Sequence, residues 1–235
     1  MTGAAISLRA LFAAMFLSLC GADALAQVTP ARSVVRSGEV DVPVTRYNNA
    51  GASRRPWVLL LPDASGAKAQ PQMIEAYAQA IVGQGVGVYV VDYEVAAGEV
   101  QVQAVRDVLL ALIVTPETDP NRVGLLGFGQ GATLAASVAA VDARVRAVVG
   151  FYGRVPDALR GRSGRMPPFL ILHGEADETV PAAQAMDLRR ILLDRGSRAE
   201  VKLYKDAGHG FSAQLDGENG RDALARMLAF FGRNL

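Results

Sequence analysis

Three short turns of this 235-residue sequence contain residues that could act together in one reaction. The first, residues 127–131, reads Gly-Phe-Gly-Gln-Gly. The second, residues 173–181, contains Asp177, and the third, residues 207–211, contains His209. A histidine oriented by an aspartate can take a proton from an attacking group. The residue types and their order therefore predict a hydrolytic site.

The first turn has the frame of a nucleophile elbow. An apolar run, residues 122–126, precedes it, and a helix-forming run, residues 132–138, follows it. A glycine-rich turn between a strand and a helix is the setting of the Gly-x-Ser-x-Gly motif. Gly127 and Gly131 suit such a tight turn, although they could also be turn glycines without a function. The central residue usually supplies the attacking hydroxyl or thiol, but here it is Gly129, which has no side chain.

The three turns together resemble the dienelactone hydrolase family of α/β-hydrolases. The resemblance lies in the elbow, in the His-Gly-x-x-Asp-x-x-Val-Pro pattern of residues 173–181, and in the Ala-Gly-His-x-Phe pattern of residues 207–211. It implies an esterase-type triad in which Asp177 is the acid and His209 is the base. The alternatives without a catalytic role are that Asp177 is a carboxylate flanking a helix and that His209 is a structural histidine in a loop.

The same resemblance implies an oxyanion hole formed by two backbone N–H groups, those of Gln130 and Ala64. Asp63 falls where the founding enzymes of the family keep a glutamate beside their cysteine. Ser65, on the same turn, is a candidate substitute nucleophile. Tyr152 is a candidate pocket residue, or a rim aromatic without a catalytic role.

Two residues depart from the family pattern. Gly129 stands where the family has cysteine or serine. Ala213 stands where the lactone-cleaving members place an arginine that holds the substrate carboxylate, which argues against dienelactone itself as the substrate. His173 is expected to be structural, because it ends an apolar run and should be buried.

The elements between these turns predict an α/β fold of the α/β-hydrolase type. Strands are expected at residues 39–47, 57–61, 86–91, 122–126, 145–151, 169–172 and 201–204. Helices are expected to begin at Pro71 and Pro181, and apolar residues at helical spacing predict others near residues 105–112, 132–138 and 224–231. This alternation predicts a mainly parallel sheet with helices on both faces. Residues 27–38 are expected to be an irregular leader, and residues 154–168 leave no room for a large lid.

Residues 1–26 have the features of a secretory signal peptide, followed by one domain over residues 27–235. Arg9 is followed by an apolar core at residues 10–20 and by an Ala-Leu-Ala cleavage site at residues 24–26. This core is too short for a permanent membrane span, so export to the periplasm or the exterior is expected. The single cysteine, Cys20, lies in the leader, so the mature chain would have no thiol nucleophile and no disulfide.

Composition excludes several function classes. The formal net charge is +1 and no basic stripe is present, which argues against nucleic acid as a partner. Two histidines are too few for a histidine-rich metal site, and neither a metal nor another cofactor is expected. The expected partner is a small-molecule ester, lactone or carboxylate.

Gly129 leaves three hypotheses open. In the first, His209 activates a water molecule and the chain is a residual carboxylic-ester hydrolase. In the second, the chain is a non-catalytic pseudoenzyme that uses the retained Asp177 and His209 pair to bind a small molecule or a partner. In the third, Gly129 is an individual lesion or a sequencing error, since one base change separates glycine from serine or cysteine codons.

Overall fold

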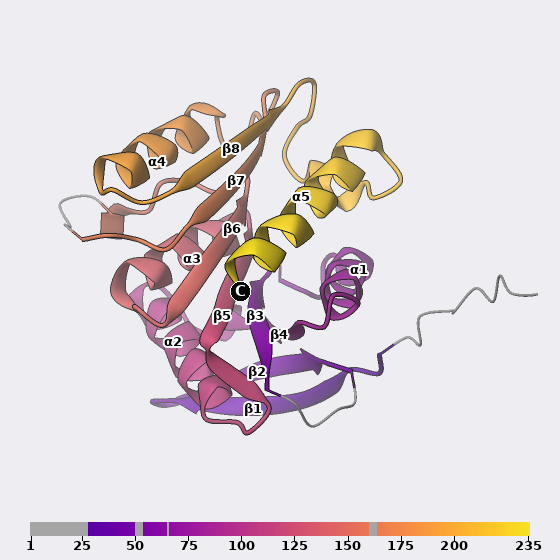
Figure 1. The fold of residues 1–235 in the computed structure, drawn as a ribbon, viewed down its shortest axis with the longest axis vertical. Coiled ribbons are helices and arrows are strands. Elements are labelled where there is room, and N and C mark those ends of the chain that lie inside the picture. Colours follow the sequence, from indigo (N-terminus) through magenta and orange to yellow (C-terminus); the bar gives the residue numbers. More distant parts are fainter. Residues whose placement is uncertain (1–27, 50–53, 65, 160–163) are drawn as a thin grey trace, which may run out of the picture.

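The computed structural model describes residues 28–49, 54–64, 66–159 and 164–235, which form an α/β fold around a single eight-stranded sheet (Figure 1). The strand order is β1-β2-β4-β3-β5-β6-β7-β8. The predicted signal peptide, Cys20 and Ser65 lie outside the described residues. The strands are β1 (Ala31–Ser37), β2 (Val40–Tyr47), β3 (Arg55–Leu61), β4 (Gly87–Val91), β5 (Thr118–Phe128), β6 (Val145–Phe151), β7 (Phe169–Gly174) and β8 (Ala199–Tyr204).

The sheet is mainly parallel, as the sequence predicts. Strands β3 to β8 pair in parallel, whereas β2 pairs antiparallel with both β1 and β4. The expectation of an irregular leader over residues 27–38 is wrong, because residues 31–37 form β1. This edge strand is mostly exposed and gains its order from pairing with β2. It therefore lacks the apolar pattern that reveals a buried strand.

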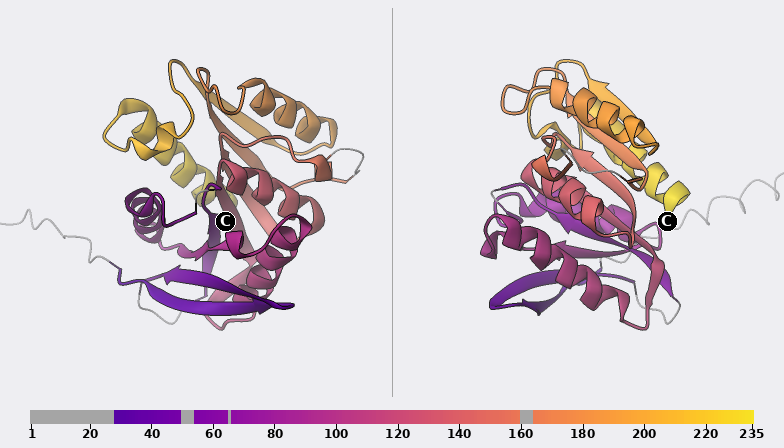
Figure 2. Two further views of the ribbon diagram at one scale, coloured as in Figure 1. Left: turned by 180° about the vertical axis from the view of Figure 1, so that it is seen from behind. Right: turned by 90° about the vertical axis from the view of Figure 1, so that its left-hand side faces the viewer.

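Helices cover both faces of the sheet (Figure 2). The helices α1 (Pro71–Val82) and α5 (Glu218–Asn234) pack on one face, and α2 (Glu99–Ile113), α3 (Gln130–Val141) and α4 (Ala183–Asp194) pack on the other. Successive side chains of β3 alternate between the two cores: Val58 and Leu60 face α1 and α5, whereas Leu59 faces the opposite side. Burial on both faces explains why this strand is apolar at every position. Helix α4 begins at Ala183, two residues after the predicted Pro181, because a tight turn from the Pro181 carbonyl to the Gln184 N–H precedes it.

The carboxyl ends of the parallel strands bring the three predicted turns to one edge of the sheet. A cluster of buried rings supports this edge, with centroids 4.8 Å apart for Phe128 and Phe151 and 5.0 Å apart for Tyr77 and Phe128. Close-packed rings hold the strand ends in fixed relative positions. Within the described part of the chain, none of the helices has the length and apolar character needed to cross a membrane.

Candidate active site

The elbow turn joins β5 directly to α3 at Gly129. This residue has φ 50° and ψ −115°, a conformation that L side chains rarely adopt. Its N–H donates to the carbonyl oxygen of Phe151 over 2.9 Å, and its own carbonyl accepts N–H bonds from Ala132 and Thr133 at the start of α3. The strand, tight turn and helix that the sequence predicts are therefore present, and the central residue of the turn lacks a side chain.

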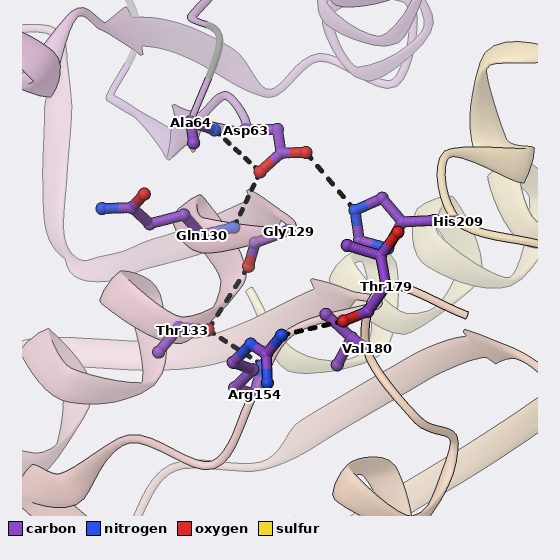
Figure 3. Close-up of a pocket in the computed structure, with 9 residues that line it drawn as sticks. All are labelled: Asp63, Ala64, Gly129, Gln130, Thr133, Arg154, Thr179, Val180 and His209. Atoms are coloured by element: carbon purple, nitrogen blue, oxygen red, sulfur yellow. Dashed lines mark hydrogen bonds and ion pairs between the residues drawn. The ribbon is translucent and has the colours of Figure 1, made fainter. Parts of the chain in front are cut away.

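Asp177 and His209 form an acid and histidine pair in which the carboxylate is buried and the imidazole is partly exposed. Asp177 follows β7, and its Oδ2 lies 2.9 Å from His209 Nδ1. Its Oδ1 accepts the backbone N–H groups of Thr179 and Val180 over 2.9 and 2.8 Å. These two bonds fix the carboxylate, which in turn orients the imidazole so that Nε2 faces the pocket (Figure 3).

The carboxylate of Asp63 occupies the point where the predicted oxyanion donors converge. Its Oδ1 accepts the N–H of Ala64 over 2.7 Å and the N–H of Gln130 over 2.9 Å. Its Oδ2 lies 3.5 Å from Nε2 of His209 (Figure 3). The two donors that the resemblance implies thus meet at one oxygen atom, and that atom belongs to the protein. The sequence places Asp63 on this turn but does not indicate which way its side chain points.

The same carboxylate fills the space that a side chain at position 129 would need. A Cβ atom built on Gly129 would lie 2.1 Å from Oδ1, 2.3 Å from Cγ and 2.6 Å from Oδ2 of Asp63. These separations are far below van der Waals contact. A side chain at position 129 and this conformation of Asp63 are therefore mutually exclusive.

The pocket around these groups has a volume of about 440 Å³. Sequence reasoning missed four of the residues that line it, Thr133, Arg154, Thr179 and Val180. The Arg154 guanidinium donates to the carbonyl oxygen of Thr179 over 2.8 Å, and the Arg154 N–H donates to Thr133 Oγ1 over 2.9 Å. Arg154 comes three residues after the carboxyl end of β6, at the same end of the sheet as the three turns, and this position in the sequence could have marked it as a pocket residue. The complete lining is Asp63, Ala64, Gly129, Gln130, Thr133, Arg154, Thr179, Val180 and His209.

Tyr152, expected as a pocket residue, lies behind His209 and is not among the residues that line the pocket. Its side chain is buried, its hydroxyl lies 2.8 Å from Ser212 Oγ, and its ring centroid is 4.5 Å from that of His209. Its φ of 43° is unusual for a residue with a side chain. This bend turns the ring into the core, where it supports the imidazole from behind.

His173 is fully buried, as the sequence predicts. Its Nε2 lies 2.8 Å from the Val180 carbonyl oxygen, so the proton is on Nε2, whereas Nδ1 has no hydrogen-bond partner among the described residues. Burial lowers the pKa of His173, because protonation would place a charge and an unpaired N–H in the core. The hydrogen bond to the Val180 carbonyl and the negative charge of Asp177 oppose this shift but do not overcome it.

This lowered pKa predicts a loss of stability on mild acidification. The unfolded chain takes up a proton at His173 below about pH 6.5, while the folded chain resists protonation until a lower pH. Stability should therefore fall as pH decreases below about 6.5, with a slope of up to about 1.4 kcal/mol per pH unit from this group. Denaturant unfolding between about pH 7.5 and 5 measures the slope. His173→Gln, which retains a donor for Val180, should flatten it, and equal slopes in the two proteins would contradict the assignment.

Across residues 28–49, 54–64, 66–159 and 164–235, no group of three or more histidine, cysteine, aspartate or glutamate side chains is arranged to hold a metal ion. Burial and the negative charges of Asp92 and Asp63 raise the pKa of Glu94, although Lys68 opposes them. A base and two converging N–H donors are the chemical groups that the site offers to a substrate.

Comparison with known proteins identifies the family. Residues 90–235 match the model of the "Dienelactone hydrolase family". A "Putative carboxymethylenebutenolidase" of Escherichia coli (strain K12) is 28% identical over 126 residues, which cover 48% of this chain and 46% of that protein. A protein of the same description from Methylorubrum extorquens is 29% identical over 108 residues, 42% of this chain and 37% of its own length. The chain thus aligns with less than half the length of these curated relatives.

Solved structures share the fold at low sequence identity. An esterase from Pyrobaculum calidifontis superposes with a TM-score of 0.77 and 16% identity, covering 87% of this chain and 85% of the esterase. A dienelactone hydrolase-like promiscuous phosphotriesterase from metagenomic libraries gives a TM-score of 0.76 and 20% identity, covering 88% and 99% of the two chains. At these identities the comparison supports the α/β-hydrolase architecture alone.

Proposed function

Because the chain belongs to the dienelactone hydrolase family, we propose that it hydrolyses small-molecule carboxylic esters or lactones without a serine or cysteine nucleophile. The observation that carries this proposal is the position of His209. Its Nδ1 is bound to Asp177, and its Nε2 faces the point where the N–H groups of Ala64 and Gln130 converge. A general base beside an oxyanion hole is what the hydrolysis of an ester requires.

In this mechanism the carbonyl oxygen of the ester replaces Asp63 Oδ1 at the two N–H groups. A water molecule attacks the carbonyl carbon and gives a proton to His209 Nε2, and Asp177 stabilises the imidazolium that forms. The tetrahedral intermediate then collapses, the alcohol leaves with the proton from Nε2, and the acid product remains. Without a covalent nucleophile, the rate enhancement over water should be about 10³–10⁴-fold, which favours activated esters.

The second candidate function is non-catalytic binding of a small carboxylate or of a partner. The observation in its favour is that Asp63 already satisfies both N–H donors. A free carboxylate that displaces Asp63 would make the same two bonds. Such a ligand would be held without turnover.

Hydrolysis of p-nitrophenyl acetate separates these functions. For a hydrolase, the rate should depend on His209 as the general base, and His209→Ala should reduce it to the uncatalysed level. Asp63→Ala should raise it, because the two N–H donors become free for the substrate. Glu178→Gln, an exposed carboxylate on the same turn as Asp177, is the matched control and should leave the rate unchanged. Equal rates in wild type and His209→Ala would reject the hydrolase in favour of binding.

The proposal includes export to the periplasm or the exterior. The basis is the order of features in residues 1–26, with a charged start, an apolar core and an Ala-Leu-Ala site. N-terminal sequencing of the protein from its native host should begin at or near Gln27. Soluble protein that still begins at Met1 would reject export.

A further inference from the structure

We propose a second activity of this pocket: Asp63 is a nucleophile that attacks alkyl halides, and the resulting alkyl ester is hydrolysed with the help of His209. The activity uses the same pocket as the proposed ester hydrolysis but differs in the nucleophile, the substrate and the bond that breaks. It starts from the conformation in which the Asp63 carboxylate lies in the oxyanion hole.

The carboxylate of Asp63 lies where the side chain of an attacking residue at position 129 would begin. Its carboxylate atoms lie within 2.1 to 2.6 Å of the site of a Cβ at Gly129, where a serine or cysteine would begin. Carboxylates form covalent intermediates in other enzymes. The two N–H bonds hold Oδ1 and leave Oδ2 facing the pocket, at 3.5 Å from His209 Nε2. Oδ2 is therefore the oxygen available for attack.

The electrophile should be a saturated carbon and not an acyl carbon. Attack on a carbonyl group creates an oxyanion that needs donors, but Oδ1 of Asp63 already occupies both N–H groups. Displacement at a saturated carbon creates no oxyanion on the substrate, so it needs no free donor. While Asp63 Oδ1 holds both N–H groups, Oδ2 can therefore attack a saturated carbon but has no oxyanion donors for attack on an acyl carbon.

The leaving group should depart as a stable anion. In the first step no proton has yet been transferred to His209, and none of the other residues that line the described pocket is a phenol or another neutral acid that could protonate a leaving alkoxide. Arg154 is the one arginine or lysine among the residues that line the described pocket. Figure 3 shows it across the pocket from Asp63. A halide satisfies both conditions, since it needs no proton and is attracted by a guanidinium. A small primary alkyl halide also fits a pocket of about 440 Å³.

The reaction then has two balanced steps. In the first, Asp63 Oδ2 forms a bond to the carbon, the carbon–halogen bond breaks, and the halide leaves with the electron pair. In the second, water attacks Cγ of the Asp63 ester and gives a proton to His209 Nε2. The negative charge develops on Oδ1, where the N–H groups of Ala64 and Gln130 already point. Collapse expels the alkoxide, which takes the proton from Nε2 and leaves as the alcohol.

The second step makes a labelling experiment decisive, because water oxygen must enter Asp63. Enzyme in excess over 1-bromobutane reacts once in oxygen-18 water and is then digested with trypsin in ordinary water. The peptide of residues 55–68 contains Asp63 as its only acidic residue. We expect bromide release, unlabelled 1-butanol and one oxygen-18 atom in this peptide at Asp63. A reaction at Ser65, on the same peptide, would leave the carboxylate unlabelled.

Three variants complete the test. Asp63→Asn should lower bromide release by at least about 10³-fold, as loss of a nucleophile does. His209→Gln should release bromide once and accumulate the butyl ester of Asp63, because hydrolysis of the ester needs the base. Glu178→Gln is the control outside the pocket lining and should behave as wild type.

Two outcomes overturn the inference. One is no bromide release above background, and the other is a butyl adduct that wild type forms but does not hydrolyse. Parallel assays of p-nitrophenyl acetate keep the two proposals separate. Ester hydrolysis without bromide release would reject the alkyl halide activity and leave the proposed ester hydrolase standing. Labelled Asp63 without ester hydrolysis would support it and reject the proposed ester hydrolase.

Discussion

The double variant Gly129→Ser/Asp63→Ala is expected to hydrolyse p-nitrophenyl acetate at least about 10²-fold faster than wild type. The serine supplies the missing attacking oxygen, and water attack becomes covalent catalysis in two easier steps. Gly129→Ser alone should gain less, because its Cβ would lie 2.1 Å from Asp63 Oδ1 and the carboxylate would still compete for the N–H groups of Ala64 and Gln130. The two substitutions should therefore be strongly non-additive.

Steady-state rates of wild type, both single variants and the double variant complete the cycle. Gly129→Ala/Asp63→Ala is the matched control, since it has the same Cβ at the elbow and no hydroxyl group. A side chain at φ 50° should cost about 1 kcal/mol of stability, so melting curves belong beside the assays. A folded double variant no faster than its alanine control would contradict the idea that only the nucleophile is missing.

Gly131→Ala is expected to destabilise the protein by about 3 kcal/mol or more. A Cβ at this position would lie 2.2 Å from the carbonyl oxygen of Leu61 and 2.3 Å from that of Pro62. Both atoms belong to the backbone at the end of β3, which cannot move aside as a flexible side chain can. The melting temperature should fall by roughly 6–12 °C for a chain of this size.

Gly232→Ala in α5 is the matched control for this substitution. A Cβ there meets nothing within 4 Å, and alanine favours a helix over glycine by up to about 1 kcal/mol, so stability should be unchanged or slightly higher. If both variants melted like wild type, the close approach of α3 to β3 would not constrain position 131.

The sequence predicts the fold well where burial controls the pattern. The apolar runs of β3 and β6 and the helical spacing of α1 reflect contact with a core, and the structure places them accordingly. It fails at β1, whose order comes from pairing with β2, a long-range property that composition does not record. Burial also explains why the sequence correctly predicts that His173, near the end of the fully buried strand β7, is buried.

The candidate site is less predictable, because it depends on side-chain direction. Motif spacing brings Asp177 and His209 together, and the structure places them 2.9 Å apart. No motif shows that Asp63 turns into the oxyanion hole or that Tyr152 turns away from the pocket. Both outcomes depend on backbone bends and on space left by other residues. For Asp63, that space is available because Gly129 has no side chain.

The mutual exclusion of Asp63 and a side chain at position 129 also bears on how this site can evolve. A single base change could return serine to position 129, but the new Cβ would meet the Asp63 carboxylate at 2.1 Å. A serine at position 129 would therefore require the Asp63 side chain to turn away, or to be replaced, before the N–H groups of Ala64 and Gln130 could receive a substrate. The effect of a substitution at position 129 thus depends on the residue at position 63 and on its conformation. The order of substitutions, and not only their identity, determines which chemistry remains within reach.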